Sequence, residues 1–284
     1  MRATFLGTAA FEGYPDAFCP CVNCQHARAL GGRSLRKRSS VLINDDLLID
    51  LGPDLMAAAQ IQGFSLTGMR YCLQTHEHAD HLDPSHFLSR SPSYEVPGAP
   101  HLHFYATQGA LDGALRSIGP HPFTDAPDGS RVSESLNLSV HTVAPFQTFA
   151  VGPYRVHSVR AAHDPSIVAL LYVIERDGRT LFYGTDTGSL PEATWSALRD
   201  SRHRFNLVML DHTFGLSARA SGHLNREQFL EQIARMHDEG LLAEDARIFA
   251  HHLAHHSNPV HPALVAIAGE RGYEVAYDGL TVTV

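Results

Sequence analysis

The sequence predicts an α/β protein of four layers, an αββα sandwich in which two sheets lie face to face and helices cover both outer faces. Short apolar runs alternate with turn residues, they do so in two successive rounds, and a helical pattern follows each round. A chain of 284 residues with 44% hydrophobic residues can bury a core of this size. Because no linker, repeat or low-complexity segment divides it, we expect residues 1–284 to form a single domain.

The first round of strands lies in the N-terminal part of the chain. Apolar runs bounded by polar residues predict strands at Ala3–Leu6, Ser40–Ile43, Leu47–Asp50 and Arg70–Leu73. The segment Asn44-Asp45-Asp46 separates two of these runs and favours a hairpin turn. A helical pattern over Pro53–Gln62 follows that hairpin.

The second round repeats this plan. Strands are predicted at Tyr154–Val159, Val168–Ile174, Leu181–Tyr183 and Asn206–Leu210. The segment Arg176-Asp177-Gly178-Arg179 favours a second hairpin turn, and Pro191–Arg199 has a helical pattern. We therefore expect two halves of similar construction.

Two further helices are predicted near the C-terminus. Asn225 is a good cap for a helix that runs to His237, and another helix covers Pro262–Gly269. We expect the chain to close on a short strand at Glu274–Tyr277. The stretches Arg90–Pro100 and Gly119–Arg131 are rich in Pro, Gly, Ser and Asp and are predicted to be surface loops.

Composition excludes some functions. A formal net charge of -8 argues against a surface that binds long nucleic acid through many phosphates. The N-terminal apolar run is broken by Glu12 and Asp16 and is too short for a signal peptide or a membrane span. We expect a cytoplasmic protein that acts on small molecules and makes no membrane contact. Its oligomeric state stays open, with a homodimer as one option.

The most informative feature is a histidine-rich segment directly after the predicted strand Arg70–Leu73. His76, His78, Asp80 and His81 fall within six residues. An extended backbone sends alternate side chains the same way, so His76 and His78 can share one ion while Asp80 and His81 bind a second. Imidazole and carboxylate suit zinc and manganese alike, and a pair of such ions activates water for hydrolysis. A solvated histidine-rich turn would not require this order or this position.

A site for two ions needs further ligands, and the sequence offers them where other predicted strands end. His163 follows Tyr154–Val159, and Asp186 follows Leu181–Tyr183. A late cluster contains His251, His252, His255 and His256. Each of these places is a point where a strand gives way to a loop, which is where ligands are usually presented.

The H-x-H-x-D-H pattern of His76, His78, Asp80 and His81 resembles that of the metallo-β-lactamase superfamily, and the resemblance extends over most of the chain. It implies the αββα fold and assigns one metal to His76, His78 and His163. The resemblance assigns the other metal to Asp80, His81 and His252, with Asp186 bridging the two ions. His251 and His256 compete with His252 because they are neighbours of the same type.

A second metal signature lies near the N-terminus. Cys19, Cys21 and Cys24 fall within six residues, and in a reducing compartment such clustering favours zinc over a disulfide. His26 or His255 can complete a tetrahedron. The C-x-C-x-x-C spacing resembles the branches that contain the phosphoribosyl cyclic phosphodiesterase and the pyrroloquinoline quinone biosynthesis protein B. That resemblance implies His255 as the fourth ligand of a structural zinc.

His223 is the candidate catalytic residue. It precedes the predicted helix and resembles the general acid of phosphodiesterase members of the superfamily, in which a metal-bridging hydroxide attacks phosphorus and a histidine protonates the departing alkoxide. We therefore expect a dinuclear phosphodiesterase of the phosphoric diester hydrolase class that acts on a small, in some cases cyclic, substrate.

Other functions remain open at this point. Thioester hydrolases of the glyoxalase type use the same seven metal ligands, and the tRNA 3′-processing endonucleases share the histidine motif. The quinone-biosynthesis branch keeps an oxidative role open, and a non-catalytic metal-binding scaffold is a further alternative. Hydrolysis of β-lactam antibiotics is disfavoured, because Asp186 stands where many true β-lactamases have a cysteine.

Overall fold

The computed structural model describes all of residues 1–284 and contains two facing sheets. The first sheet has nine strands in the order β16-β1-β2-β3-β4-β5-β8-β7-β6. Their bounds are β1 Arg2–Gly7, β2 Ser40–Ile43, β3 Leu47–Ile49, β4 Tyr71–Leu73, β5 Leu102–Ala106, β6 Thr124–Asp125, β7 Arg131–Ser133, β8 Leu138–Thr142 and β16 Thr281–Thr283.

The second sheet has seven strands in the order β15-β14-β13-β12-β11-β10-β9. Their bounds are β9 Thr148–Val151, β10 Tyr154–Arg160, β11 Leu170–Arg176, β12 Arg179–Gly184, β13 Phe205–Asp211, β14 Leu242–His251 and β15 Glu274–Val275. The strands β12, β13, β14 and β15 are parallel, so the chain leaves β12, β13 and β14 at one edge of this sheet.

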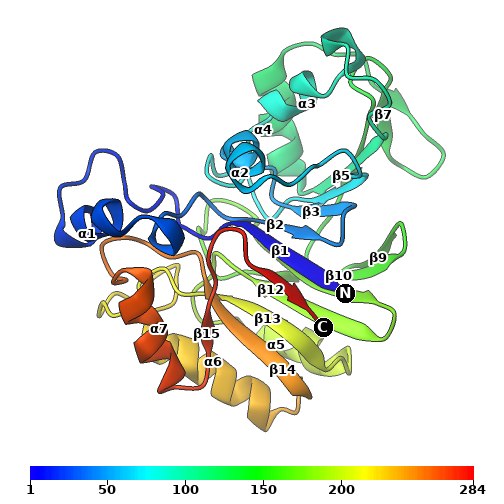
Figure 1. The fold of residues 1–284 in the computed structure, drawn as a ribbon. Coiled ribbons are helices and arrows are strands. Elements are labelled where there is room, and N and C mark those ends of the chain that lie inside the picture. Colours follow the sequence, from blue (N-terminus) through cyan, green and yellow to red (C-terminus); the bar gives the residue numbers. More distant parts are fainter.

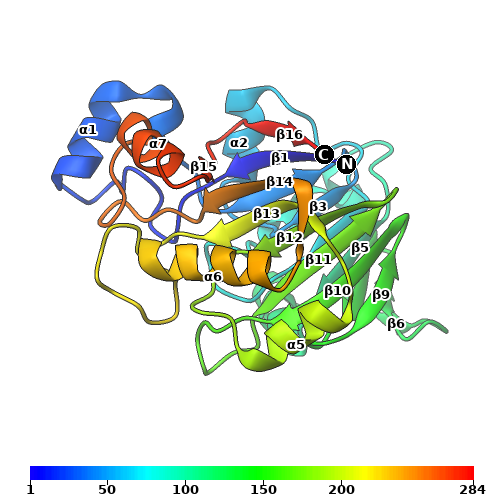
Figure 2. The same cartoon turned by 90° about the horizontal axis from the view of Figure 1, so that it is seen from below.

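Helices cover both outer faces of the sandwich (Figure 1, Figure 2). Three of them, α2 (Leu55–Gln62), α3 (Ser85–Ser89) and α4 (Gln108–Ile118), pack on the first sheet. Three others, α5 (Glu192–Asp200), α6 (Arg226–Asp238) and α7 (His261–Gly269), pack on the second sheet. A separate helix, α1 (Val22–Leu30), lies to the side, and short 3-10 turns form at Gly32–Ser34 and Pro92–Tyr94.

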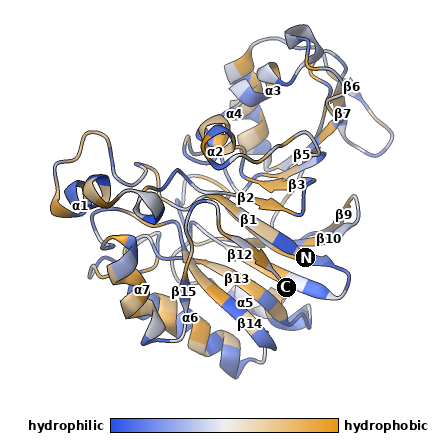
Figure 3. Ribbon diagram, in the orientation of Figure 1, coloured by the Kyte–Doolittle hydropathy of each residue, from blue (hydrophilic) through white to orange (hydrophobic).

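The core has three layers of apolar contact, one between the sheets and one under each set of helices. Alternation along the strands produces this division, because successive side chains point to opposite faces. In β1, for example, Phe5 faces the other sheet and Leu6 faces α2 and its neighbours. Figure 3 shows apolar residues concentrated along the strands of both sheets. The predicted four-layer α/β fold is thus confirmed.

Most predicted elements are present with shifts of one or two residues. The hairpin between β11 and β12 turns on Asp177 and Gly178, whose φ angles are 52° and 71°, as the turn chemistry predicts. Asn225 caps α6 through a reciprocal capping box with Gln228.

The strand predicted near Glu274–Tyr277 is present as β15, but the prediction that the chain closes on it was wrong. A further strand, β16, follows and adds to the first sheet beside β1. Val282 is the only buried residue of this three-residue strand, so the sequence contains no apolar alternation from which the strand could be predicted. The stretches predicted as surface loops are mostly irregular, and within them lie the short 3-10 turn Pro92–Tyr94 and the exposed two-residue strand β6. No helix is both long enough and apolar enough to cross a membrane.

Candidate metal centre

The histidine motif follows β4, at the edge where β12, β13 and β14 of the other sheet also end. Gln74 holds this segment in a closed loop, since its Nε2 donates to the carbonyl oxygens of His76 (2.9 Å) and His81 (3.0 Å). The loop then turns as one helical turn, in which the His81 amide donates to the His78 carbonyl at 3.0 Å. His76, Asp80 and His81 are buried as a result.

One group of potential metal ligands combines His76, His78, His163 and Asp186, whose donor atoms all lie within 4.8 Å of one another. The Nδ1 of His78 is 3.1 Å from the Nε2 of His163. The Nε2 of His76 is 3.1 Å from the Oδ2 of Asp186. The chain thus brings residues from the ends of β4, β10 and β12 to one point.

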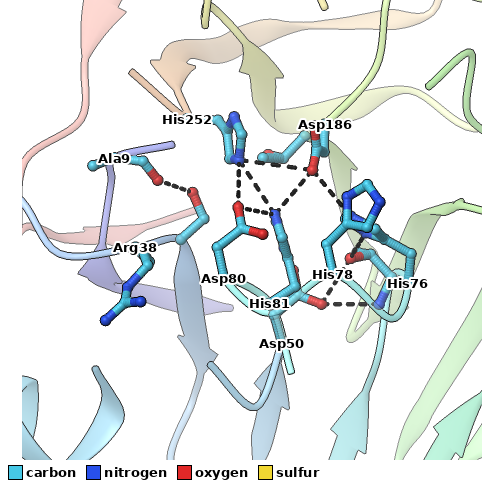
Figure 4. A network of polar contacts seen from close by, with 12 residues as sticks. Ala9, Arg38, Asp50, His76, His78, Asp80, His81, Asp186 and His252 are labelled. Carbon is cyan, nitrogen blue, oxygen red and sulfur yellow. Dashed lines mark hydrogen bonds and ion pairs between the residues drawn. The ribbon is translucent and has the colours of Figure 1, made fainter. Parts of the chain in front are cut away.

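A second group combines Asp80, His81, Asp186 and His252 within the same limit. The Nε2 of His81 is 3.2 Å from the Nε2 of His252 and 3.0 Å from the Oδ2 of Asp186. Figure 4 shows Asp186 and His252 facing Asp80 and His81. Asp186 belongs to both groups, so its carboxylate lies where one side chain can serve two ions. Asp186 and His252 have φ angles of 63° and 57°, which turn the chain sharply just past β12 and β14.

The chemistry of these residues fits divalent cations. His76 Nε2, Asp80 Oδ1 and Asp186 Oδ1 are buried and have no hydrogen bond of regular geometry, although His76 Nε2 is 3.1 Å from Asp186 Oδ2 and Asp186 Oδ1 is 3.0 Å from His223 Nδ1. Buried polar atoms without a regular hydrogen bond are rare in folded proteins. Burial and the charge of His81 lower the pKa of His76 to about 4, so its imidazole is neutral and can donate a lone pair. Burial raises the pKa of Asp186, but the surrounding histidines outweigh it and hold the pKa well below its usual range. Imidazole nitrogens such as that of neutral His76, beside the ionised carboxylate of Asp186, are donors that suit zinc and manganese.

Neighbouring oxygens orient four of the imidazoles through their Nδ1 atoms. These contacts are His76 Nδ1 to Thr75 Oγ1 (2.9 Å), His81 Nδ1 to Asp50 Oδ2 (2.7 Å), His163 Nδ1 to the Gly222 carbonyl (3.2 Å) and His252 Nδ1 to Thr213 Oγ1 (2.8 Å). Such contacts fix ring orientation and tautomer in metal proteins. Asp50 and Thr213 were not among the predicted site residues, although Asp50 ends an apolar strand much as Asp186 follows one.

His223 lies beside this centre. Its Nδ1 is 3.0 Å from Asp186 Oδ1 and 3.1 Å from the Oδ2 of Asp211, a fully buried carboxylate at the end of β13. Burial lowers the pKa of His223, but the charges of Asp211 and Asp186 outweigh it and raise the pKa to about 10. Asp211 is fixed in turn by the backbone amides of Thr213 and Leu224. Asp211 is a further site residue that sequence reasoning missed.

A small pocket of about 180 Å³ opens onto the centre. Its floor is formed by potential ligands and His223, and its rim contains Phe11, Glu12, Phe214 and His256. Three larger hollows, of about 510, 400 and 400 Å³, contain none of the predicted ligands. The pocket over the centre is therefore the one relevant to chemistry.

The structure distinguishes among the late histidines. His251 is a buried core residue, with its Nε2 3.1 Å from the Gly7 carbonyl and its Nδ1 3.2 Å from Thr185 Oγ1. His256 lies at the pocket rim, 3.7 Å from Glu12. His252 alone of these three belongs to the ligand group.

The three cysteines also meet a histidine. Cys19, Cys21, Cys24 and His255 have donor atoms within 4.8 Å of one another, and Cys21 Sγ is 3.5 Å from His255 Nδ1. The structure brings His255 and not the exposed His26 to the cysteines. Burial raises the pKa of Cys21, but hydrogen bonds from the Cys24 amide and His255 outweigh it and lower the pKa to about 6. No disulfide forms, and Cys72 is buried in the core, away from this cluster.

Comparison with known proteins agrees with this geometry. A family model described as a β-lactamase superfamily domain matches residues 46–251. The chain belongs to this superfamily. The match covers most of the chain, so the predicted family is confirmed. Members of this superfamily are generally metal-dependent hydrolases.

Curated relatives include coenzyme PQQ synthesis protein B from two bacteria. The protein from Klebsiella pneumoniae (strain 342) is 26% identical over 100% of this chain and 98% of its own length. The protein from Azotobacter vinelandii (strain DJ / ATCC BAA-1303) is 27% identical over 75% of this chain and 74% of its own length.

Solved structures with the same fold include a diphosphatase from the PhnP family, at 19% identity and a TM-score of 0.74 over 99% of this chain and 97% of that one. Zinc-bound PqqB from Methylobacterium extorquens has a TM-score of 0.71 at 20% identity, with full coverage of both chains. The short form of human tRNase Z has a TM-score of 0.65 at 16% identity over 100% of this chain and 99% of that one. At these identities the likeness shows the fold alone.

Proposed function

We propose that this protein is a dinuclear metal-dependent phosphodiesterase that cleaves a small phosphodiester, cyclic ones included. The observation that carries this proposal is the position of His223, which lies between the shared carboxylate Asp186 and the buried Asp211 and lines the pocket over the metal centre.

The proposed ligand sets follow the two groups described above. His76, His78 and His163 would hold one ion, Asp80, His81 and His252 would hold the other, and Asp186 would contact both. Bound zinc or manganese ions supply an activated water and neutralise charge on phosphoryl oxygens. The residues themselves keep the centre rigid, because five of the seven proposed ligands are buried and four of the imidazoles are oriented by fixed oxygens.

His223 would protonate the departing alkoxide. Both carboxylates engage its Nδ1, which leaves Nε2 as the nitrogen available to a substrate in the pocket. A positioned acid of this kind contributes about 10²–10⁴-fold to the rate. Alkoxides of sugars and simple alcohols need this proton, whereas an acidic phenolate leaves without it.

The pocket favours a compact substrate. It has a volume of about 180 Å³, and neither lysine nor arginine is among the residues that line it. Together with a formal net charge of -8, this arrangement lacks the basic track that a long nucleic acid requires. We therefore propose a small-molecule partner in the cytoplasm, where the clustered cysteines stay reduced.

The cluster of Cys19, Cys21, Cys24 and His255 would hold a structural zinc. All four donors come from the protein, so a tetrahedral ion here has no open position for substrate. His255 is three residues beyond His252, and a zinc at this cluster would tie the N-terminal segment to the loop that carries His252.

A screen of diester substrates tests the proposal. Protein loaded with zinc or manganese is assayed on cyclic nucleotides, cyclic ribose phosphates and generic diesters, with precursor tRNA in parallel. Turnover of small diesters without tRNA cleavage is the expected result. Full metal loading with no turnover of any diester would contradict it, and tRNA cleavage would indicate the endonuclease alternative.

A second candidate is the role of the PQQ synthesis protein B relatives. The full-length match at 26% identity favours it, and so does the cysteine cluster. This alternative is supported if the metal-loaded protein consumes oxygen in the presence of a quinone precursor and hydrolyses no diester.

A further inference from the structure

A third group of histidines lies on the first sheet, outside both clusters described above. His103 of β5 and His141 of β8 stand on adjacent parallel strands, and His103 Nδ1 is 3.1 Å from His141 Nε2. His103 pairs with Tyr71 at the start of β4, whereas the metal-binding loop follows the other end of that strand. The proposed phosphodiesterase mechanism does not use this pair.

The spacing of this pair matches the spacing within the metal centre. There, His78 Nδ1 and His163 Nε2 are 3.1 Å apart, and the Nε2 atoms of His81 and His252 are 3.2 Å apart. Two imidazole nitrogens that each lie about 2.0–2.1 Å from one tetrahedral ion are separated by roughly 3 Å. The pair His103 and His141 already has the separation of a chelating pair.

Aromatic contacts hold both rings in place. His141 stacks on Tyr105 with centroids 4.3 Å apart and an interplanar angle of 10°. His103 stacks on Tyr71 with centroids 5.8 Å apart and an angle of 28°. Ring orientation is therefore set before any ligand arrives, which lowers the entropic cost of binding.

The local charge favours a cation. Burial and the neighbouring histidines lower the pKa of His141 to about 4 and also lower that of His103, so both rings are neutral near pH 7. Of the groups that shift these two pKa values, the exposed Asp128 is the one with a negative charge, and none is a lysine or an arginine. Both rings are only partly buried, so water can reach the nitrogens.

We propose that His103 and His141 form an additional metal site that binds one borderline divalent transition-metal ion, such as nickel, copper or zinc, with water completing its coordination. These ions prefer imidazole nitrogen, and the site offers two such donors. The ion would clamp β5 to β8 and act on stability, independently of the phosphodiesterase chemistry.

Nickel titration of the full chain loaded with three equivalents of zinc, one for each ion of the two clusters described above, tests this site. Calorimetry should detect one nickel site on the wild type. The variants His103→Gln and His141→Gln should each bind nickel at least tenfold more weakly, because each keeps one donor of the pair. A matched control is His237→Gln, which removes a histidine whose side chain is 81% exposed and should change nothing. Equal nickel affinity in wild type and both pair variants would overturn the proposal.

A measurement on the unaltered protein covers the case in which a variant folds poorly. Bound nickel is paramagnetic and should broaden the ring resonances of Tyr71 and Tyr105 at one equivalent. It should also raise the melting temperature of the wild type. Broadening at other rings only, with Tyr71 and Tyr105 unaffected, would show that the ion binds elsewhere and would contradict the site.

Discussion

The His/Asp metal centre and the cluster of three cysteines with His255 are assembled by the fold in different ways. In the central cluster, His76 and His81 come from the first sheet and Asp186 and His252 from the second, and all four are at most 3% exposed. In the cysteine cluster, three of the four donors fall within six residues, on a loop and the first turn of α1, and Cys19 and Cys21 are only half-buried. The central cluster therefore depends on the whole sandwich, whereas the cysteine cluster depends on one short segment and one distant histidine.

This difference separates their roles. A centre assembled from strand ends of both sheets is rigid and faces a pocket, as catalysis requires. A closed cluster on a peripheral loop instead fixes that loop to the rest of the chain. Changes in the central cluster should abolish activity, and changes in the cysteine cluster should mainly affect stability.

The largest effect is expected from Asp186→Ala. This substitution removes a donor from both central groups at once, so diesterase activity should fall below detection. Elemental analysis should show loss of both central ions while the cysteine zinc remains. Retention of two ions in the centre would show that Asp186 is not shared.

The next largest effect is expected from His223→Ala. Turnover of alkyl diesters should fall by about 10²–10⁴-fold, because the leaving alkoxide loses its acid. Turnover of bis(p-nitrophenyl) phosphate should change little, and metal content should not change. Equal loss on both substrates would argue that His223 only positions Asp186.

Asp50→Asn tests the orientation of a ligand without touching the ion. Asp50 accepts from the Thr75 amide at 2.9 Å and contacts His81 Nδ1 at 2.7 Å. Removing such an outer contact typically lowers metal affinity about 10–100-fold. A competition titration with a zinc-binding dye measures the change in zinc affinity. An affinity equal to that of the wild type would contradict the proposed role of Asp50 in orienting His81.

Cys24→Ser should separate the two clusters. We expect loss of one zinc per chain and a lower melting temperature, with less than a tenfold change in kcat, because His252 keeps its other contacts. Cys72→Ala is the matched control, since Cys72 is buried in the core away from the cluster and should keep the zinc. A Cys24→Ser protein with full zinc content would exclude the cysteine site.

The smallest effect concerns the pH dependence of stability and His261, the first residue of α7. Burial, together with Arg36 and Arg33, lowers the pKa of His261 from 6.5 to about 4. The unfolded chain therefore takes up this proton first, so the stability linked to neutral His261 is complete above about pH 6.5 and is lost as pH falls towards about 4. Between about pH 6.5 and about pH 4, the unfolding free energy of the His261→Gln variant should therefore fall less than that of the wild type, by at most about 3 kcal/mol. Parallel curves for variant and wild type would contradict it.

The elements that could be predicted from the sequence are those marked by a short pattern of neighbouring residues. The hairpin between β11 and β12, the capped helix α6 and the strands that precede the ligands are all marked by short patterns of turn or apolar residues. Sequence reasoning did not identify β5, α4 and β8. Histidines interrupt both strands, two glycines weaken the pattern of α4, and parallel pairing between distant segments leaves no local trace.

The predicted ligand residues are brought together, but their supporting contacts were not predicted. The rule that found Asp186, an acid just past an apolar strand, applies equally to Asp50 and Asp211. Thr75 and Thr213 carry no such signal, because a hydroxyl acquires its role only from the imidazole it meets. Ligands can be found from residue type and spacing, whereas their supports depend on three-dimensional contact.

The most direct test of the account is anomalous diffraction at the zinc edge from crystals grown with zinc. The account predicts two peaks flanking the Asp186 carboxylate, one beside His163 and one beside His252, and a further peak among Cys19, Cys21 and Cys24. An empty centre with His163 and His252 turned away from Asp186 would contradict it.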